Sequence, residues 1–330
     1  MDLATNYLGL SLRNPFVVGA SPFCDDVDVA RKLQDAGAAA VVMRSVFEEQ
    51  IEARREPAFS PSPFVQAQGA HGDPGFSEFA GYQLTPEEYV RQIDDLKKQL
   101  TIPVIASLNG RGLGNWAGFA ARLERAGADA IELNCYHVVT DPHIAADQVE
   151  NEILQALGAL TSSVRIPVAV KLSPFHASVA QLAVALELAG ASGIVVFDRF
   201  YQPDVSTEDI EVQPSLRLSE SSELLLRLRW LAILSPLLRG SLSASGAIHT
   251  PADVVKALLT GADTVQLVSV LLQHGPQILV TLRKGFELWM QAHDYSETGQ
   301  FRGQLNLQRC RNPAAFERAN YIRALQSWKI

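Results

Sequence analysis

The sequence predicts an α/β fold of the (β/α)8 TIM-barrel type, in which eight parallel strands alternate with helices. The first observation is a recurring join in which an amphipathic stretch is followed by Gly-Ala and then by a run rich in Val, Ile and Leu. Glycine suits the left-handed residue that ends a helix, and the apolar run suits a strand covered on both faces. The join occurs in residues 35–44, 125–134, 188–197 and 259–268.

The second observation is an Ile-Pro-Val join, because proline is tolerated at the first residue of a strand. Two further apolar runs complete a set of eight strands in chain order, and alternating strands and helices predict parallel pairing with right-handed crossovers. A doubly wound open sheet is disfavoured, since no Gly-x-Gly-x-x-Gly turn follows the first strand. These additional strands lie in 101–108 and 165–172 (Ile-Pro-Val) and in 15–20 and 240–245.

Helix starts, long connections and a tail follow from the same pattern. Residues 85–88 (TPEE) and 250–253 (TPAD) each place a capping threonine, a proline at the first helical position and an acid two residues later. Connections from about 47 to 84 and from 198 to about 221 are too long for plain barrel loops, and both follow the C-terminal ends of strands, after strands 2 and 6. We expect them to cover the mouth of the barrel. The predicted barrel spans residues 1–303, and a helical extension spans 304–330.

Composition excludes several classes of protein. The 330 residues are 47% hydrophobic, and 28 Lys plus Arg against 36 Asp plus Glu give a net charge of −8, which argues against a nucleic-acid binder. Cys24, Cys135 and Cys310 lie far apart, with no zinc-type or Cys-x-x-Cys spacing. The first residues do not resemble a signal peptide, and no run approaches the ~18 apolar residues of a membrane span. A cytoplasmic protein with no resident metal and no membrane partner is expected.

The C-terminal strand ends, which converge on one mouth in a barrel, carry the chemistry-bearing residues. Arg44 and Lys171 are cations at the ends of apolar strands, and each needs an anionic partner because buried unpaired charge is costly. One interpretation is a structural ion pair with a carboxylate such as Asp198. The full set of strand-end candidates is Ala20-Ser21, Arg44-Ser45, Ser107, Asn109, Asn134 to His137, Lys171, Phe197-Asp198, Ser245-Gly246-Ala247 and Val268-Ser269.

The ends of the last two strands indicate a phosphate site. Both are small, and exposed backbone N–H groups after strands seven and eight form the common phosphate site of this fold. A phosphate pocket, a lysine pointing to the axis and two covering loops suit flavin mononucleotide (FMN), with Lys171 near the edge of the ring. The same geometry suits a sugar-phosphate substrate, so the pattern alone leaves both open.

The chain resembles the dihydroorotate dehydrogenases, FMN enzymes that oxidise dihydroorotate to orotate in pyrimidine synthesis, over roughly residues 3 to 303. The resemblance rests on LGLSLRNPF with Ala20-Ser21 beyond it, on GADAIELN, IPVAVKL and SGAI…GADTVQLVSVLL, and on ELWMQAHDYSETGQFRG. It implies that Lys171 contacts the flavin, that Asn134 contacts flavin and substrate, and that Gly246-Ala247 and Val268-Ser269 bind the phosphate. The expected FMN-binding set is Ala20, Ser21, Arg44, Ser45, Asn109, Asn134, Lys171, Gly246, Ala247, Val268 and Ser269.

The substrate side departs from the family pattern. His137 stands where the family has a cysteine or serine base, Val139 replaces a second substrate-binding asparagine, and Arg44 replaces the usual lysine. Phe197-Asp198 replaces an Asn-Ser or Asn-Thr pair, and a glycine-rich turn expected near residue 218 reads RLSES. A histidine with a pKa near 6.5 suits a base at neutral pH, whereas Cys135 needs a lowered pKa to compete.

Three functions follow. The first is an FMN-dependent oxidoreductase acting on dihydroorotate or a related planar acid, with His137, Lys171, Asn134 and Arg44 as catalytic residues. The second is a flavin-free phosphate-binding lyase or isomerase. The third is a flavin-binding homologue with another substrate or without turnover. The resemblance also suggests a homodimer. The sequence leaves the oxidant open between a separate electron-transfer subunit, fumarate and oxygen.

Overall fold

The computed structural model describes residues 1–48, 51, 84–110, 116–135, 138–199 and 202–327. Eight parallel strands close into a barrel, so the predicted fold class is confirmed. Neighbouring strands pair in the order β11-β12-β3-β4-β5-β6-β7-β8, with β8 returning to β11. Their bounds are β3 Phe16–Val18, β4 Ala40–Phe47, β5 Val104–Asn109, β6 Ala130–Asn134, β7 Val168–Leu172, β8 Gly193–Val196, β11 Ser241–Ser245 and β12 Thr264–Leu267.

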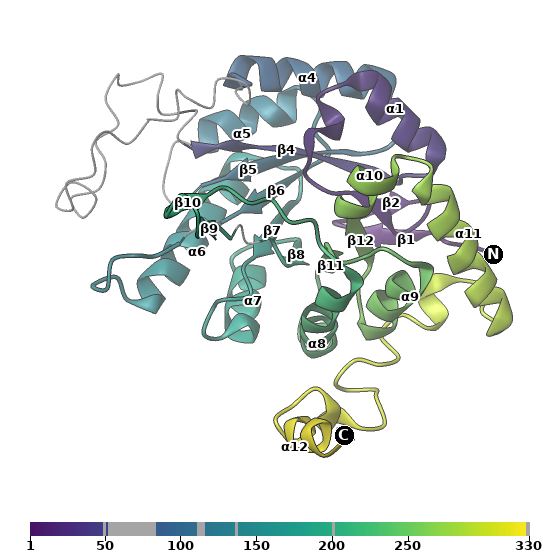
Figure 1. Cartoon of the computed structure of the whole chain (residues 1–330). Coiled ribbons are helices and arrows are strands. Elements are labelled where there is room, and N and C mark those ends of the chain that lie inside the picture. Colours follow the sequence, from purple (N-terminus) through teal and green to yellow (C-terminus); the bar gives the residue numbers. More distant parts are fainter. Residues whose placement is uncertain (49–50, 52–83, 111–115, 136–137, 200–201, 328–330) are drawn as a thin grey trace.

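Helices form a ring outside the barrel, and along the chain they alternate with the barrel strands (Figure 1). A short α10 (Ser269–His274) lies between β12 and the last helix of the ring, and α12 (Ala319–Ser327) lies away from the barrel in the picture. The ring consists of α1 Val27–Ala36, α4 Pro86–Gln99, α5 Trp116–Arg125, α6 Ala146–Ser163, α7 Val179–Leu188, α8 Leu224–Leu234, α9 Pro251–Thr260 and α11 Ile278–Ala292.

The local rules that predicted the helix ends are confirmed. Thr85 and Thr250 each accept a hydrogen bond from the backbone N–H three residues on, and the carboxylate there accepts one from the threonine backbone N–H, which completes both capping boxes. The glycine of every Gly-Ala join has a positive φ, between 100° and 122°. Side chains avoid that region, so glycine at these four joins ends the helix and lets the chain turn into the next strand.

The barrel interior is filled from below by an N-terminal hairpin. Strands β1 (Thr5–Tyr7) and β2 (Leu10–Leu12) pair antiparallel ahead of the first barrel strand. Their Tyr7, Leu8 and Leu12 pack in one cluster with small and branched residues that the barrel strands turn inward. This cluster is separate from the larger core between the strands and the helices. The inward residues nearer the C-terminal strand ends are instead polar, so the mouth is chemically distinct from the apolar floor.

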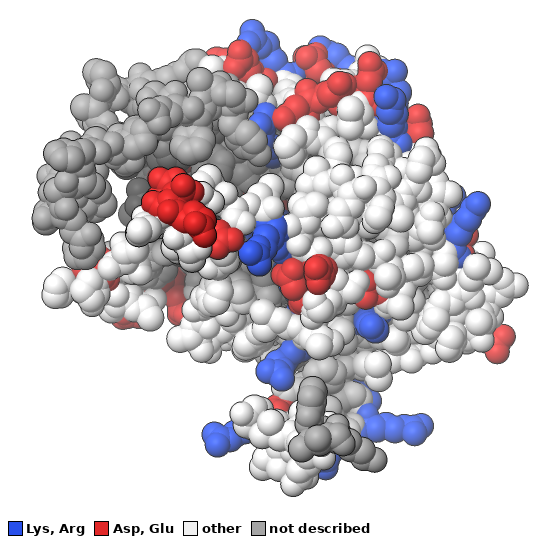
Figure 2. Space-filling view, viewed as in Figure 1, with Lys and Arg blue, Asp and Glu red and all other residues white. Residues whose placement is uncertain are grey.

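The connection after β8 contains a small antiparallel hairpin, β9 (Asp204–Ser206) and β10 (Glu211–Gln213). Figure 2 shows acidic side chains gathered over this hairpin, next to a basic group. The connection then enters the 3-10 turn η3 (Ser221–Glu223) ahead of α8. Within the part of the chain that the structure describes, no helix has both the length and the apolarity needed to cross a membrane.

Asp253, in the first turn of α9, ties this connection to the barrel. Its carboxylate accepts hydrogen bonds from Ser221 Oγ at 2.6 Å and from the backbone N–H groups of His249 and Thr250 at 3.1 and 2.9 Å. Burial alone raises the pKa of Asp253, but these hydrogen bonds outweigh it, and the pKa lies below its usual value. The ionised form is therefore the stabilising one.

Replacement of Asp253 with asparagine is expected to lower the free energy of unfolding by about 1–3 kcal/mol near neutral pH, since hydrogen bonds to an ionised group are lost. Because the folded pKa is depressed, the contribution is present above the unfolded value of about 3.9 and is lost as pH falls through the folded pKa. Urea unfolding at several pH values measures the difference. Asp147→Asn, at an exposed site, is the control, and a difference that does not shrink in acid would contradict this assignment.

Candidate functional site at the barrel mouth

A closed network of polar side chains crosses the barrel axis at the floor of the mouth. Lys171 Nζ lies 3.0 Å from Glu132 Oε1 and donates to Gln266 Oε1 at 3.1 Å, and Gln266 Nε2 donates to Glu132 Oε2 at 2.5 Å. The Lys171 and Glu132 side chains are 6% and 1% exposed. The ammonium carries three N–H groups, so the third has no hydrogen-bond partner among the described residues. The network holds a fixed positive group at the mouth with one donor to spare.

The carboxylate partner of Lys171 is Glu132, so the interpretation of a structural ion pair is confirmed, although the pair does not involve Asp198, the carboxylate given as its example. Asp198 follows the end of β8, and burial raises its pKa although the charge of Lys171 and a hydrogen bond from the Asn134 side chain lower it. Glu132 pairs instead because it also points inward from β6, where residues alternate between the lumen and the helix layer. The prediction that both strand-end cations have anionic partners is confirmed.

Asn134, the last residue of β6, carries a buried acceptor without a donor. Its side chain is 6% exposed, and its Oδ1 has no hydrogen-bond partner among the described residues. Asn109 ends β5 as its register partner, so the two amides lie side by side at the mouth. A buried polar atom left unpaired costs about 1–3 kcal/mol. A bound molecule with an N–H or O–H group would remove that cost.

Arg44 lies in a β-bulge. Val42 pairs with Ile105 and Ser45 with Ser107, so two residues of β4 stand opposite one residue of β5, and a bulge of this kind re-aims a side chain. Arg44 Nη2 lies 2.6 Å from the carboxylate of Asp25, which follows the 3-10 turn η1 (Pro22–Cys24). Its neighbour Ser45 shares a 2.7 Å hydrogen bond with Ser107. The guanidinium of Arg44 is thus paired with a carboxylate that lies just before α1 in the chain.

The predicted phosphate turns lie together at the ends of β11 and β12. Gly246 and Ala247 have φ of 76° and 62°, a strained conformation for alanine. Ser219, from the RLSES stretch, sits between them and the next strand end. Its Oγ accepts from Ala247 N at 3.0 Å, and its N–H donates to Ser269 Oγ at 3.0 Å. The connection after β8 therefore covers this edge of the mouth, and Ser219 bonds to two of the predicted phosphate-binding residues.

The other predicted cofactor residues occupy the rim. Ser21 is buried and donates to Gly19 O at 2.9 Å, Ala20 packs beside the lumen cluster, and Val268 immediately precedes α10. The structure thus brings the predicted FMN-binding residues of the described chain to one mouth. His137, proposed as the base, lies outside the described residues.

A cavity of about 490 Å³ opens beside the ends of β6 and β7. Cys135 lies in its wall, and burial, followed by the charge of Glu48, raises the pKa of this thiol to about 12. The thiol is therefore protonated at neutral pH and is a poor base. The described lining residues include no lysine or arginine; they are Cys135, Val138, Val139, Ile144, Ala146, Val149, Glu150, Ile153, Ser173, Phe175, His176 and Ala177.

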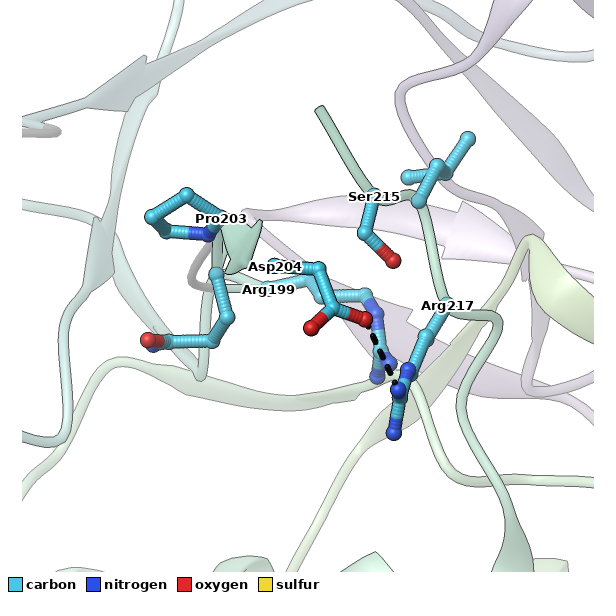
Figure 3. A pocket seen from close by; sticks show the side chains of 7 residues that line it. Arg199, Pro203, Asp204, Ser215 and Arg217 are labelled. Carbon is cyan, nitrogen blue, oxygen red and sulfur yellow. Dashed lines mark hydrogen bonds and ion pairs between the residues drawn. The ribbon is translucent and has the colours of Figure 1, made fainter. Parts of the chain in front are cut away.

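A second cavity, of about 400 Å³, lies within the connection after β8. Figure 3 shows the Asp204 carboxylate beside Arg217, to which it is bound at 3.1 Å. Arg199 also lines the cavity, and it binds both carboxylate oxygens of Glu223, at 3.2 and 3.0 Å. Both arginines are already paired at the surface, where such pairs contribute little.

Sequence reasoning missed four residues that build this site, namely Glu132, Gln266, Asp25 and Ser219. Glu132 had a usable signal, because a carboxylate in the apolar run AIELN is expensive unless paired. Gln266 stands in the same kind of position on β12. The contacts of Asp25 and Ser219 depend on how loops fold onto the mouth, and the periodicity of the sequence does not predict how loops fold.

Comparison with known proteins supports the resemblance. The family model described as dihydroorotate dehydrogenase matches residues 2–211. A putative dihydroorotate dehydrogenase A (fumarate) of Aeropyrum pernix is 26% identical over 302 residues, which cover 88% of this chain and 94% of the relative. The catalytic subunit of dihydroorotate dehydrogenase B (NAD(+)) of Methanothermobacter thermautotrophicus is 23% identical over 91% of this chain and 97% of its own. The chloroplastic dihydropyrimidine dehydrogenase (NADP(+)) of Arabidopsis thaliana is 22% identical over 92% of this chain and 76% of its own.

Proposed function

The chain belongs to the dihydroorotate dehydrogenase family of oxidoreductases acting on CH–CH donors, and we propose that it transfers hydride from a dihydropyrimidine-type substrate to FMN. The observation that carries this proposal is the buried Lys171–Glu132–Gln266 network, which presents a fixed cation at the mouth. FMN, when bound, supplies the hydride acceptor. Lys171 would keep a positive charge against it, where a preorganised charge in a water-poor site is most effective.

The residues present fit such a cofactor. The unpaired Oδ1 of Asn134 is an acceptor for a ring N–H, and the spare N–H of Lys171 is a donor for a ring oxygen or nitrogen. Gly246 has no Cβ, and a Cβ there would lie 3.2 Å from Arg227 Nη2, so glycine lets the guanidinium approach the turn where a phosphate is expected. Buried donors and acceptors in these places match a planar heterocycle carrying a phosphate tail.

The proton acceptor that we propose is His137, since the pKa of Cys135 is too high for that role. Electrons would leave the flavin for a separate subunit or a small acceptor, because the three cysteines of the chain form no Cys-x-x-Cys run for an iron–sulfur cluster. A relative named as a catalytic subunit supports the first route.

Dihydroorotate is the substrate that the family name suggests, but a neutral dihydropyrimidine is a second candidate. Two observations favour it. Arg44, the predicted catalytic cation, which would bind the substrate carboxylate or the flavin, is held at 2.6 Å by Asp25. The cavity beside β6 and β7 has Val138 and Val139 in its wall with no lysine or arginine among its described lining. A carboxylate moved into such surroundings loses hydration without gaining a cation. The Arabidopsis relative is named for a dihydropyrimidine.

The expected result is that purified protein supplied with FMN shows a flavin absorbance band that bleaches anaerobically with a dihydropyrimidine. Dihydroorotate and dihydrouracil are added separately, and the faster bleaching identifies the substrate class. Protein without substrate, illuminated for the same time, is the control. A protein that takes up no FMN would overturn the proposal and leave a flavin-free phosphate-binding barrel. Flavin that binds but stays oxidised with both compounds would leave a flavin-binding homologue with another substrate.

A further inference from the structure

Arg227 of α8 is a buried arginine that lies outside the Lys171–Glu132–Gln266 network. The residue is 5% exposed. Its Nε donates to Ser245 O, at the end of β11, and its Nη1 donates to the Glu223 backbone oxygen at 3.0 Å. Nη2 is the nitrogen nearest Gly246, 3.2 Å from where a Cβ would stand, and it makes no hydrogen bond to the described residues. The guanidinium therefore lies against the predicted phosphate turn with donors unused.

The charge of Arg227 is not neutralised by an ion pair. Among the described residues no carboxylate lies within 4.0 Å of the guanidinium, and both of its hydrogen-bond acceptors are backbone carbonyls. Burial lowers the pKa of Arg227, and the charge of Glu223 only partly offsets that effect. This differs from Arg199 and Arg217, which are more exposed and paired. A buried cation with spare donors and no anion is costly unless a bound anion completes it.

We propose that Arg227 binds the phosphate of FMN at the Gly246–Ala247 turn and makes this chain selective for the phosphorylated flavin over riboflavin. The inference rests on the proposed function and deepens it. A guanidinium offers parallel donors that match phosphate oxygens, and Nη2 is the donor left over. The backbone alone is poorly placed here, because Gly246 N–H donates to Gln266 O and Ala247 N–H donates to Ser219 Oγ. Arg227 therefore supplies the charge that this edge of the mouth otherwise lacks.

A purely structural arginine is the competing interpretation, since Nε and Nη1 join α8 to the end of β11. The two interpretations differ in one measurable respect. A structural arginine supports every ligand of the mouth equally, whereas a phosphate-binding arginine affects only ligands that carry a phosphate. FMN and riboflavin share the same ring and ribityl chain, so the ratio of their affinities isolates the phosphate.

The experiment titrates apoprotein with FMN and with riboflavin, following flavin fluorescence, for wild type, Arg227→Gln and Arg229→Gln. Arg229 is the matched control, because it is two residues along the same helix and exposed. Loss of a charged hydrogen bond to phosphate is expected to weaken FMN at least about 10-fold in Arg227→Gln. Riboflavin affinity should stay within about 2-fold, since its ring contacts are unchanged. Arg229→Gln should match wild type for both flavins.

Equal losses for FMN and riboflavin, or no loss for either, in Arg227→Gln would overturn the inference while leaving the proposed function intact. Failure of the wild type to bind either flavin would overturn the proposed function and the inference with it. If the glutamine variant does not fold, Arg227→Lys decides. Lysine keeps the charge but lacks the planar fork, so a smaller selective loss for FMN is expected. An unchanged ratio of FMN to riboflavin affinity in that variant would show a structural role.

Discussion

Replacement of Glu132 with glutamine is expected to lower the free energy of unfolding by about 3–5 kcal/mol, the usual cost of removing one partner of a buried ion pair. Glutamine has nearly the same shape and can still accept from Gln266. What is lost is the negative charge 3.0 Å from Lys171 Nζ, which leaves a buried ammonium without a counter-ion. Urea unfolding followed by circular dichroism measures the change.

The double replacement Glu132→Leu with Lys171→Met is the control for that result. It removes both charges at once, so no unpaired ion remains in the barrel, and replacing a buried pair by apolar residues of similar volume is often neutral. We expect the double variant to be more stable than Glu132→Gln. A double variant as unstable as the single one would show that the lost hydrogen bonds of the buried Gln266 amide, and not an unpaired charge, set the cost at this position.

Much of the fold follows from local rules that act within a few residues. Each Gly-Ala join ends a helix because glycine adopts the positive φ that the turn needs, and the capping boxes at Thr85 and Thr250 start helices through bonds three residues apart. The apolar runs then become strands covered on both faces. Such signals depend only on neighbouring residues, so a single sequence carries them, and the order of eight strands fixes the barrel.

The partners in the mouth do not follow from local rules. Lys171 of β7 stands opposite Asn134 of β6 in the ladder. Its ammonium nevertheless bonds to Glu132, two residues before Asn134 on β6, and to Gln266, which is 95 residues away in the chain. For side chains of given length, strand tilt decides which inward residues meet at the axis, and the tilt is not visible in the sequence. Asp25 pairs with Arg44 because a bulge in β4 re-aims the arginine.

In the helix layer, too, the local sequence does not predict which residues are buried, and Arg227 is an example. In LLLRLRW, Arg227 and Arg229 look equivalent, two residues apart on an apolar helix. The structure buries the first beneath the end of β11 and exposes the second. Helix rotation against the barrel makes that choice through packing of the whole α8 face, so the sequence offers no basis for preferring one arginine.

Replacement of Lys171 with methionine should slow flavin reduction by the substrate about 10²–10³-fold, the effect of removing one preorganised donor from a reacting site. The midpoint potential of bound FMN should also fall by about 30–60 mV, because a charge-assisted hydrogen bond is worth about 1.5–3 kcal/mol and 30 mV corresponds to about 1.4 kcal/mol for two electrons. Stopped-flow absorbance under anaerobic conditions gives the rate, and dye equilibration gives the potential.

The potential separates a charge effect from a folding effect. Lys171→Met leaves Glu132 buried without its cation, so the single variant is destabilised, and the double variant with Glu132→Leu should carry no such penalty. Lys171 uses two N–H groups within the network and keeps the third for the mouth. Both variants should therefore show the lower potential if that N–H acts on the flavin. A wild-type potential in the stable double variant would mean that Lys171 serves only to neutralise Glu132, and the cation at the mouth would lose its proposed role.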